Sequence, residues 1–283
     1  MTSDIQTPPE RNPEVKRLRA SGPILILAVL FLGGAFLSWY FSWFGRDLTD
    51  TDISQYLVDD KHPRKVQHAL FQIQQRLERG DPSAKQWYPQ LIRLASHPEA
   101  EFRLTGAWVM GFDNKSDEFH HTLLQLLRDP EPIVRRNAAL ALVRFNDSSG
   151  RPEMIAMLKP FDVQSPVNGL VASTLKEGAR VARGTLLGRI TKPDETNVEV
   201  RSPLLGKLER ILAPSGTNVT QSQTLLTINS DEDSIWEALR GLSLIGQPED
   251  LALIERYAQD SGQSSRIQEQ AALTAKAIRQ RAA

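Results

Sequence analysis

The stretch 165–228 constrains the fold of this chain most, because it contains two copies of one sequence pattern. The first copy opens with Ser165–Gly169 (Ser-Pro-Val-Asn-Gly), and the second opens with Ser202–Gly206 (Ser-Pro-Leu-Leu-Gly). Each copy continues through a glycine-containing turn to an apolar run, Leu186–Ile190 in the first and Leu225–Ile228 in the second. Short apolar runs separated by Gly and Pro are typical of strands and tight turns. The repeat therefore predicts a β domain built from two equivalent halves.

This pattern resembles the lipoyl/biotinyl domain, a small sandwich of two interlocked half-barrels, over about a quarter of the chain. Carrier members of that family attach their cofactor to a lysine at the tip of the hairpin that joins the halves, usually within Met-Lys-Met or Asp-Lys-Ala. Here the hairpin 191–197 reads Thr-Lys-Pro-Asp-Glu-Thr-Asn. The family's lysine position falls on Asp194 or Glu195, depending on which half is aligned, and the nearby Lys192 precedes a proline. We therefore expect a lipoyl/biotinyl-like domain, 162–230, without a cofactor.

Composition excludes several classes of chemistry. The chain has no cysteine, which rules out disulfides, thiol nucleophiles and cysteine-ligated metals. It carries 34 basic and 34 acidic side chains, so nothing favours a nucleic-acid partner. No nucleophile elbow, Walker loop or dinucleotide-binding glycine motif occurs, and the five histidines lack the spacing of a metal site. We expect no catalytic, cofactor-binding or metal-binding residues, and hence no enzyme.

The N-terminal region reads as a membrane anchor. Residues 1–22 are polar and proline-containing, which predicts a disordered cytoplasmic tail. Residues 23–44 are uncharged and apolar, and about 20 such residues suffice for a transmembrane helix. The basic residues at 16–19 favour a cytoplasmic N-terminus, which places the linker 45–61 and all that follows in the periplasm. These features predict a single-pass protein of the bacterial inner membrane; a cleaved signal peptide is the competing interpretation.

Helical repeats flank the β domain on both sides. Apolar residues recur at helical spacing in 64–79, and the segment 97–110 matches the segment 129–142 in its loop, apolar residue, arginine and small residues. This pattern resembles HEAT-type repeats, most strongly in 126–146. We predict HEAT-like repeats over 62–161 that continue over 231–283, with the β domain inserted into one repeat. Because helical repeats bury their cores only against neighbours, the two flanks should pack together.

The predicted fold class is therefore α+β multidomain: a single transmembrane helix and a HEAT-like α-helical solenoid interrupted by a lipoyl/biotinyl-like β-sandwich. Arginines lie on the second helices of the repeats. Arg103 and Arg135 are expected to brace the loop aspartate of their own or a neighbouring repeat. Arg136 and Arg144 are the candidates for a partner-binding surface, because in HEAT-like arrays this layer often lines the face that binds proteins.

These features predict a non-catalytic, membrane-anchored scaffold or adaptor that binds other proteins outside the cytoplasm. Cofactor-free lipoyl-like domains also occur in periplasmic adaptor (membrane-fusion) proteins, which suggests an accessory subunit of a membrane transport or envelope complex. Those adaptors usually insert a long α-hairpin between the half-motifs and continue into β-barrel domains, whereas this chain has a short turn and no such continuation. The alternatives are a biotin or lipoyl carrier subunit that uses Lys192, and a periplasmic sensor.

Overall fold

The computed structural model describes residues 22–43 and 47–283, and the chain divides into two compact units, Met1–Leu48 and Thr49–Ala283. The expected disordered tail lies outside the described residues except for Gly22, and so do the basic residues at 16–19. Helices and strands both form, which confirms the mixed helix-and-sheet content expected from the sequence.

The described helix of the first unit is α1 (Gly22–Trp43). Among the residues that the structure describes, no helix has the length and apolar character needed to cross a membrane. This finding overturns the transmembrane helix predicted for 23–44, and with it the single-pass location in a bacterial inner membrane.

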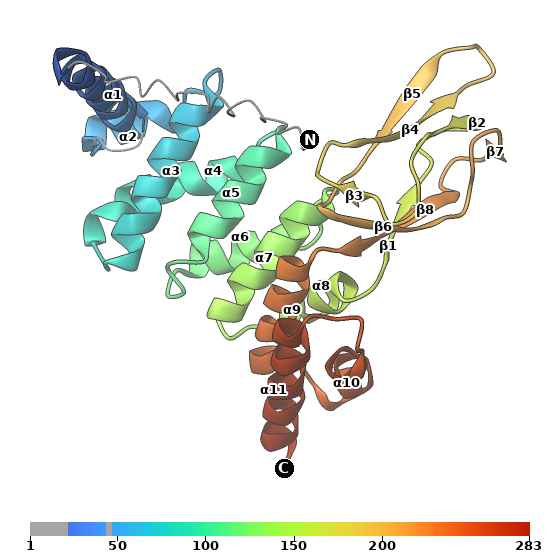
Figure 1. Cartoon of the computed structure of the whole chain (residues 1–283). Coiled ribbons are helices and arrows are strands. Elements are labelled where there is room, and N and C mark those ends of the chain that lie inside the picture. Colours follow the sequence, from blue (N-terminus) through green and yellow to red (C-terminus); the bar gives the residue numbers. More distant parts are fainter. Residues whose placement is uncertain (1–21, 44–46) are drawn as a thin grey trace, which may run out of the picture. The chain divides into compact units, whose positions relative to one another are not determined.

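The second unit contains helices that pack as consecutive pairs, each pair contacting the next (Figure 1). The pairs are α2 (Asp50–Tyr56) with α3 (Pro63–Glu78), α4 (Tyr88–Leu94) with α5 (Ala100–Met110), α6 (Asp117–Leu126) with α7 (Pro132–Arg144), α8 (Arg151–Met157) with α9 (Glu232–Ile245), and α10 (Leu251–Gln259) with α11 (Ser265–Ala282). Short 3₁₀ turns precede α4, α8 and α10. The second helices α3, α5, α7, α9 and α11 contact one another in that order and form one layer.

Local sequence explains where these helices begin and how closely they pack. Ser116, Asp231 and Ser264 accept hydrogen bonds from the free backbone N–H groups of the first turns of α6, α9 and α11. Small residues then permit close contact, because a Cβ added at Gly150 would lie 2.8 Å from the Cα of Ala139 on α7. A small residue is thus required at Gly150, where the 3₁₀ turn Ser148–Gly150 packs against α7.

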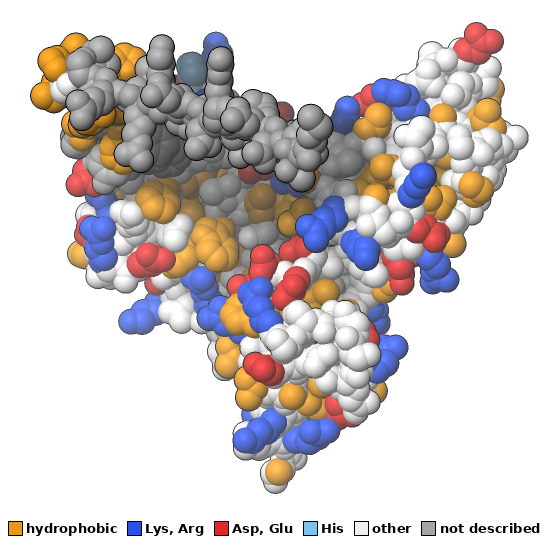
Figure 2. All heavy atoms as spheres, in the orientation of Figure 1, with side chains coloured by type: hydrophobic (Ala, Val, Ile, Leu, Met, Phe, Trp, Pro, Cys, Tyr) orange, Lys and Arg blue, Asp and Glu red, His pale blue; other side chains and the backbone are white. Residues whose placement is uncertain are grey.

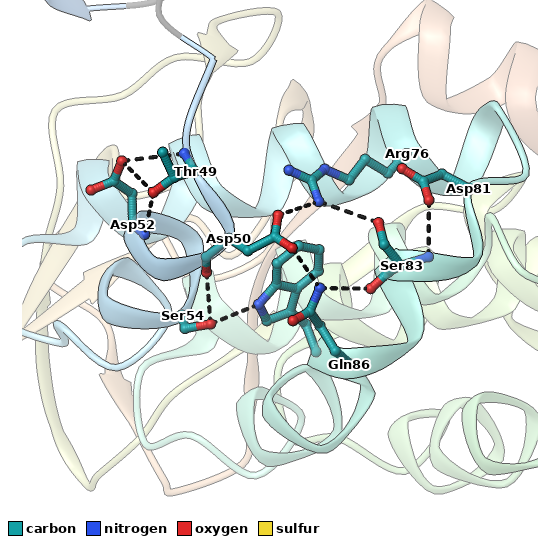
Figure 3. Close-up of polar contacts among 9 residues, drawn as sticks. Thr49, Asp50, Asp52, Ser54, Arg76, Asp81, Ser83 and Gln86 are labelled. Carbon is teal, nitrogen blue, oxygen red and sulfur yellow. Dashed lines mark hydrogen bonds and ion pairs between the residues drawn. The ribbon is translucent and has the colours of Figure 1, made fainter.

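A polar network fastens α2 to the first repeats (Figure 3). The Asp50 carboxylate accepts hydrogen bonds from Arg76 Nη1 at 2.7 Å and from Gln86 Nε2 at 3.1 Å. The indole Nε1 of the fully buried Trp87 donates to Ser54 Oγ at 3.0 Å. These bonds join α2, α3 and the 3₁₀ turn Pro82–Trp87, so this acidic segment serves the packing of the array.

The β domain consists of two four-stranded antiparallel sheets. Their orders are β1-β8-β6-β3 and β5-β4-β2-β7, so each sheet contains the same positions of the sequence repeat in the same order. The strands are β1 (Phe161–Gln164), β2 (Gly169–Ala172), β3 (Arg180–Val181), β4 (Leu186–Thr191), β5 (Asn197–Arg201), β6 (Gly206–Ile211), β7 (Asn218–Val219) and β8 (Thr224–Ser230). Each half supplies strands to both sheets, so neither half can form its sheet alone.

Matching residues of the two halves have matching contacts. Ser165 Oγ donates to the carbonyl of Val167 at 2.6 Å, and Ser202 Oγ donates to that of Leu204 at 2.7 Å. A Cβ at Gly206 would lie 2.1 Å from the carbonyl oxygen of Asn229, which explains why the Ser-Pro-x-x-Gly motif ends in glycine. The glycine of the motif is therefore required for the close approach of β6 to its neighbour β8.

The β domain separates the two helices of one pair, because β1 follows α8 and β8 leads into α9 (Figure 1). One hydrophobic core nevertheless contains residues from both sides of the domain, including Met154 and Met157 before it and Leu239 and Ile267 after it. The Tyr257 hydroxyl also donates to the carbonyl of Leu158 at 2.8 Å. The helical array thus closes across the β domain.

Candidate functional site

The four arginines singled out from the sequence have three different environments: two brace loops, one is buried and one is exposed. Arg103 donates from Nε and Nη2 to the two carboxylate oxygens of Asp129, at 2.6 and 2.9 Å, and from Nη1 to backbone carbonyls of its own loop. Arg135 bonds the carbonyls of Asp129 and Pro130, and its Nε donates to Glu153 at 3.2 Å. Both side chains tie their own loop to the following repeat. Arg103 pairs with a loop aspartate, as predicted, whereas the carboxylate that Arg135 bonds belongs to Glu153.

These contacts lower the pKa of the Asp129 carboxylate. Burial alone would raise the pKa of Asp129, but hydrogen bonds from Arg103 and from the backbone N–H of Glu131 outweigh burial and hold that pKa below its ordinary value. The carboxylate therefore stays ionised in the folded protein, and its role is structural.

Arg136 does not lie where a partner could reach it. The residue is 3% exposed, and its Nε has no hydrogen-bond partner in the described chain. Burial lowers the pKa of the Arg136 guanidinium, while the charges of Glu153 and Asp231 act in the opposite direction. The expectation that Arg136 belongs to a partner-binding surface is corrected by this burial: α7 turns the side chain between packed helices.

Arg144, the second candidate, is exposed at the C-terminal end of α7. Its guanidinium carbon lies 4.0 Å from the ring centroid of Phe112 and 5.2 Å from that of Trp108, within the range of cation–π contacts. Partial burial lowers the pKa of Arg144, and the nearby charge of Arg240 lowers it further. Two like charges thus lie close together at this point of the surface.

Arg144 borders a groove of about 150 Å³ that crosses α7 between α5 and α9. We call it the Arg144 groove. It is lined by Trp108 from α5, by Leu140, Ala141, Val143 and Arg144 from α7, and by Glu237, Arg240, Gly241 and Leu244 from α9. Trp108 is 40% exposed and Leu244 is 59% exposed. The groove therefore combines an apolar floor, two exposed apolar side chains, two arginines and the carboxylate of Glu237.

Trp108 lies at the surface of α5, and the sequence alone does not reveal this position. α5 is apolar on most sides, so helical periodicity cannot tell which of its large residues faces solvent. The indole Nε1 of Trp108 donates to Gln74 Oε1 at 3.3 Å, and Phe112 packs edge-on against its ring. The side chain is thus held in place at the rim of the groove.

A larger cleft, of about 1100 Å³, lies between the β domain and the last helices. Its lining carries charges of both signs, among them Lys207, Arg256, Asp231 and Glu232. Asp231 caps α9, and Glu232 accepts a hydrogen bond from Ser264 at 2.7 Å. Figure 2 likewise shows Lys and Arg interspersed with Asp and Glu over the visible face of the described residues.

The hairpin between β4 and β5 carries Lys192, the residue of the carrier alternative. Lys192 Nζ lies 3.1 Å from the Asp194 carboxylate. Hydrogen bonds from the hydroxyl and backbone N–H of Thr196, together with Lys192, lower the pKa of Asp194 to about 2. The lysine at this tip is therefore paired with a carboxylate of its own turn.

The acidic residues after the first unit are engaged with neighbouring basic side chains. Asp50 pairs with Arg76 at 2.7 Å, and Asp59 lies 2.7 Å from His62 and 3.1 Å from Lys65. Within residues 22–43 and 47–283, no group of three His, Cys, Asp or Glu side chains is arranged to hold a metal ion.

Comparison with known proteins supports one part of the array. The HEAT repeat family model matches residues 121–148, which include most of α6, all of α7 and the loop that follows it as far as Ser148. The segment 126–146, singled out from its sequence pattern, lies inside this match, so the HEAT-repeat prediction is confirmed there. No curated protein matches the chain. HEAT repeats generally mediate protein–protein interactions. Residues 121–148 of this chain form a HEAT repeat.

Proposed function

We propose that this protein is a non-catalytic scaffold that binds another protein through the second-helix layer of its helical array. The observation that carries the proposal is the Arg144 groove, in which Trp108 and Leu244 expose apolar surface beside two arginines. Tryptophan and arginine are enriched at the energetic centres of protein interfaces. A helical array also presents such a groove on a rigid support, because each second helix is packed between its neighbours.

The β domain is proposed to be a lipoyl/biotinyl-like module that serves as a second surface rather than as a carrier. The strand orders of its two sheets support this assignment. In each sheet, one half of the repeat supplies its first and third strands and the other half supplies its second and fourth. The ion pair of Lys192 with Asp194 argues against a lysine waiting for a cofactor. Intact-mass spectrometry of the protein from its native host is expected to give the unmodified mass; a biotin or lipoate adduct on Lys192 would establish the carrier alternative.

The scaffold proposal is tested by site-specific photo-crosslinking in the native host. A benzophenone amino acid at position 244 is expected to yield a discrete adduct with a second protein, because Leu244 stands exposed at the groove. Position 212 is the matched control, since Leu212 is a leucine of similar exposure, 52%, that does not line the groove. Equal adducts from both positions, or crosslinks only within the chain, would refute the proposal.

A second variant tests whether the adduct depends on the groove or on nonspecific binding. Trp108→Ala removes the aromatic rim of the groove without touching residue 244, and it is expected to abolish the adduct formed from position 244. Circular dichroism of this variant is the control for folding, because Trp108 is 40% exposed and its truncation also removes buried contacts; loss of the adduct supports the groove when the spectrum matches that of wild type.

A further inference from the structure

The exposed apolar side chains of the helical array lie on one of its two layers. Within the described helices of Thr49–Ala283, the large apolar side chains that are exposed are Phe71 on α3, Trp108 on α5, Leu244 on α9 and Leu273 on α11, at 40% to 61%. All four belong to second helices, and the first helices α2, α4, α6, α8 and α10 expose none. The remaining second helix, α7, supplies Leu140 to the Arg144 groove. Every second helix therefore contributes apolar surface to this layer.

Phe71, Trp108 and Leu244 face the same side of the layer. Trp108 Nε1 donates to Gln74 Oε1 of α3 at 3.3 Å. Gln74 follows Phe71 by three residues, a spacing that places two side chains beside each other on a helix. Trp108 and Leu244 both line the Arg144 groove. The apolar surface thus continues from α3 across α5 to the groove and α9.

Leu273 extends this surface to α11. The guanidinium carbon of Arg266 lies 4.8 Å from the ring centroid of Trp236, so these side chains of α11 and α9 face the same side. Arg240 contacts the same ring, at 5.4 Å, and also lines the Arg144 groove. Leu273 follows Arg266 by seven residues and lies on the same face of α11. We call the surface formed by Phe71, Trp108, Leu140, Leu244 and Leu273 the apolar stripe.

The spacing of the apolar stripe matches that of an α-helix laid across it. Packed helices lie about 8–10 Å apart, and α3, α5, α7, α9 and α11 contact one another in sequence, so the stripe takes four such steps. A helix presents the same face every seven residues, a rise of about 10.5 Å, which is close to one step. Side chains on one face of a β-strand recur about every 6.7 Å, which is too short for one step and too long for half of one.

The width and length of the stripe also suit a helix. On α9 the residues that line the Arg144 groove run from Glu237 to Leu244, about 10 Å along the helix axis. A helix with its side chains is about 10–12 Å in diameter, whereas extended chains lie side by side at about 4.8 Å. Four steps amount to about 40 Å, or about 27 helical residues. A specific protein interface uses about 20–30 residues on each side.

We propose that the occupant of the apolar stripe is one amphipathic helix of a partner protein, whose large apolar side chains recur about every seven residues. It lies across the five second helices, with its apolar face on the stripe and its polar face in water. This inference rests on the proposed scaffold function and names the form and sequence pattern of the partner. Burial of the exposed apolar side chains on both partners drives the association.

The test measures the spacing of crosslinks on the partner. A benzophenone amino acid is placed in turn at positions 71, 244 and 273 of the full-length chain in its native host, and mass spectrometry maps the attached residues. We expect all three positions to capture one protein. Three steps separate α3 from α9 and one separates α9 from α11. The partner residues captured from 71 and 244 should therefore lie about 21 residues apart, and those from 244 and 273 about seven apart.

Two controls accompany this measurement. Position 58 should give no adduct with the same protein, because Val58 is an exposed apolar residue, at 57%, outside the second helices. Leu273→Glu should lower the yield of the adduct from position 244 about tenfold, since it places a charge under the apolar face of the partner. Leu212→Glu, an equally exposed position in the β domain, should leave that yield unchanged.

Several outcomes overturn the inference. Partner residues only about nine apart for positions 71 and 244 would identify an extended polyproline-type segment. Different proteins captured at the two ends of the stripe, adducts only within this chain, or an unchanged yield in Leu273→Glu would equally refute a single crossing helix. If position 244 captures a protein and positions 71 and 273 do not, the scaffold function stands and the crossing helix is refuted. If no position captures a protein, both proposals fail.

Discussion

Removal of the Arg151 guanidinium is expected to weaken the helical array on both sides of the β domain. Arg151, at the start of α8, donates from Nε and Nη2 to the two carboxylate oxygens of Asp250, both at 2.8 Å. Asp250 follows Arg151 by 99 residues in the sequence, and the whole β domain lies between them. Arg151→Met keeps most of the side-chain length and removes the charge and both hydrogen bonds.

The cost follows from the burial of the two partners. Asp250 is 5% exposed, so the variant leaves a carboxylate in a site that water reaches poorly. Breaking a fully buried pair costs about 3–5 kcal/mol. The Arg151 side chain is 24% exposed, and Asp250 keeps a hydrogen bond from the Gln247 backbone N–H at 2.9 Å, so part of that cost is recovered. We therefore expect a loss of about 2 kcal/mol in the free energy of unfolding.

Urea unfolding followed by circular dichroism gives this loss, and hydrogen exchange read by mass spectrometry locates it. Peptides from α8, before the β domain, and from α9 and α10, after it, should lose protection together, because one core spans them. Arg189→Met is the control: it breaks an exposed pair with Glu199 at 3.3 Å and should cost less than about 0.5 kcal/mol. A loss in Arg151→Met as small as the control's, or reduced protection on one side only, would refute a continuous array.

Three further predictions concern single groups. Because the pKa of Asp129 is lowered, its ion pair stabilises the protein above the unfolded pKa of about 3.9, and this stabilisation is lost as pH falls through the folded pKa. When unfolding is measured at decreasing pH, Arg103→Met should therefore lose less free energy of unfolding than wild type. Equal losses would contradict the pairing. Gly206→Ala places a Cβ against the Asn229 carbonyl and should destabilise the β domain by about 3 kcal/mol. Gly216→Ala, in open space at φ 88°, should cost about 1 kcal/mol. Thermal unfolding that ranks the two variants in the opposite order would refute the close approach of β6 to β8. Thr274→Val removes a buried hydroxyl that donates to a carbonyl of α9 at 2.9 Å and should cost about 1 kcal/mol in urea unfolding; a neutral result would show that the hydroxyl contributes nothing to this helix contact.

Local and repeated patterns carried the successful predictions. The pairing of Arg103 with a loop aspartate follows from the repeated loop pattern, because Asp129 occupies the loop of the following repeat. The twofold motif ending in Gly169 and Gly206 likewise predicted two equivalent halves, and the strand orders of the two sheets agree. Such features are readable because the residues that interact are neighbours in sequence or repeat each other.

Predictions that depend on packing between distant helices failed. Arg136 and Arg144 occupy the same helix, yet one is buried and the other exposed, and no local pattern separates them. Trp108 is exposed because the helix layer leaves its face of α5 uncovered at the groove. The apolar character of residues 23–44 was read as a membrane crossing, and the described helices offer none.

The sequence by itself determined the helix pairs, the caps that start them, the doubled β domain and the arginines that brace the loops, because each arises from short-range order or from repetition. The tertiary structure decided which side chains meet outside those units. Trp108, Arg144 and Leu244 come from three helices, and the last is separated from the others by the entire β domain. Their groove exists because α8 and α9 pair across that domain, and the exposure of a side chain depends on the helix that lies beside it.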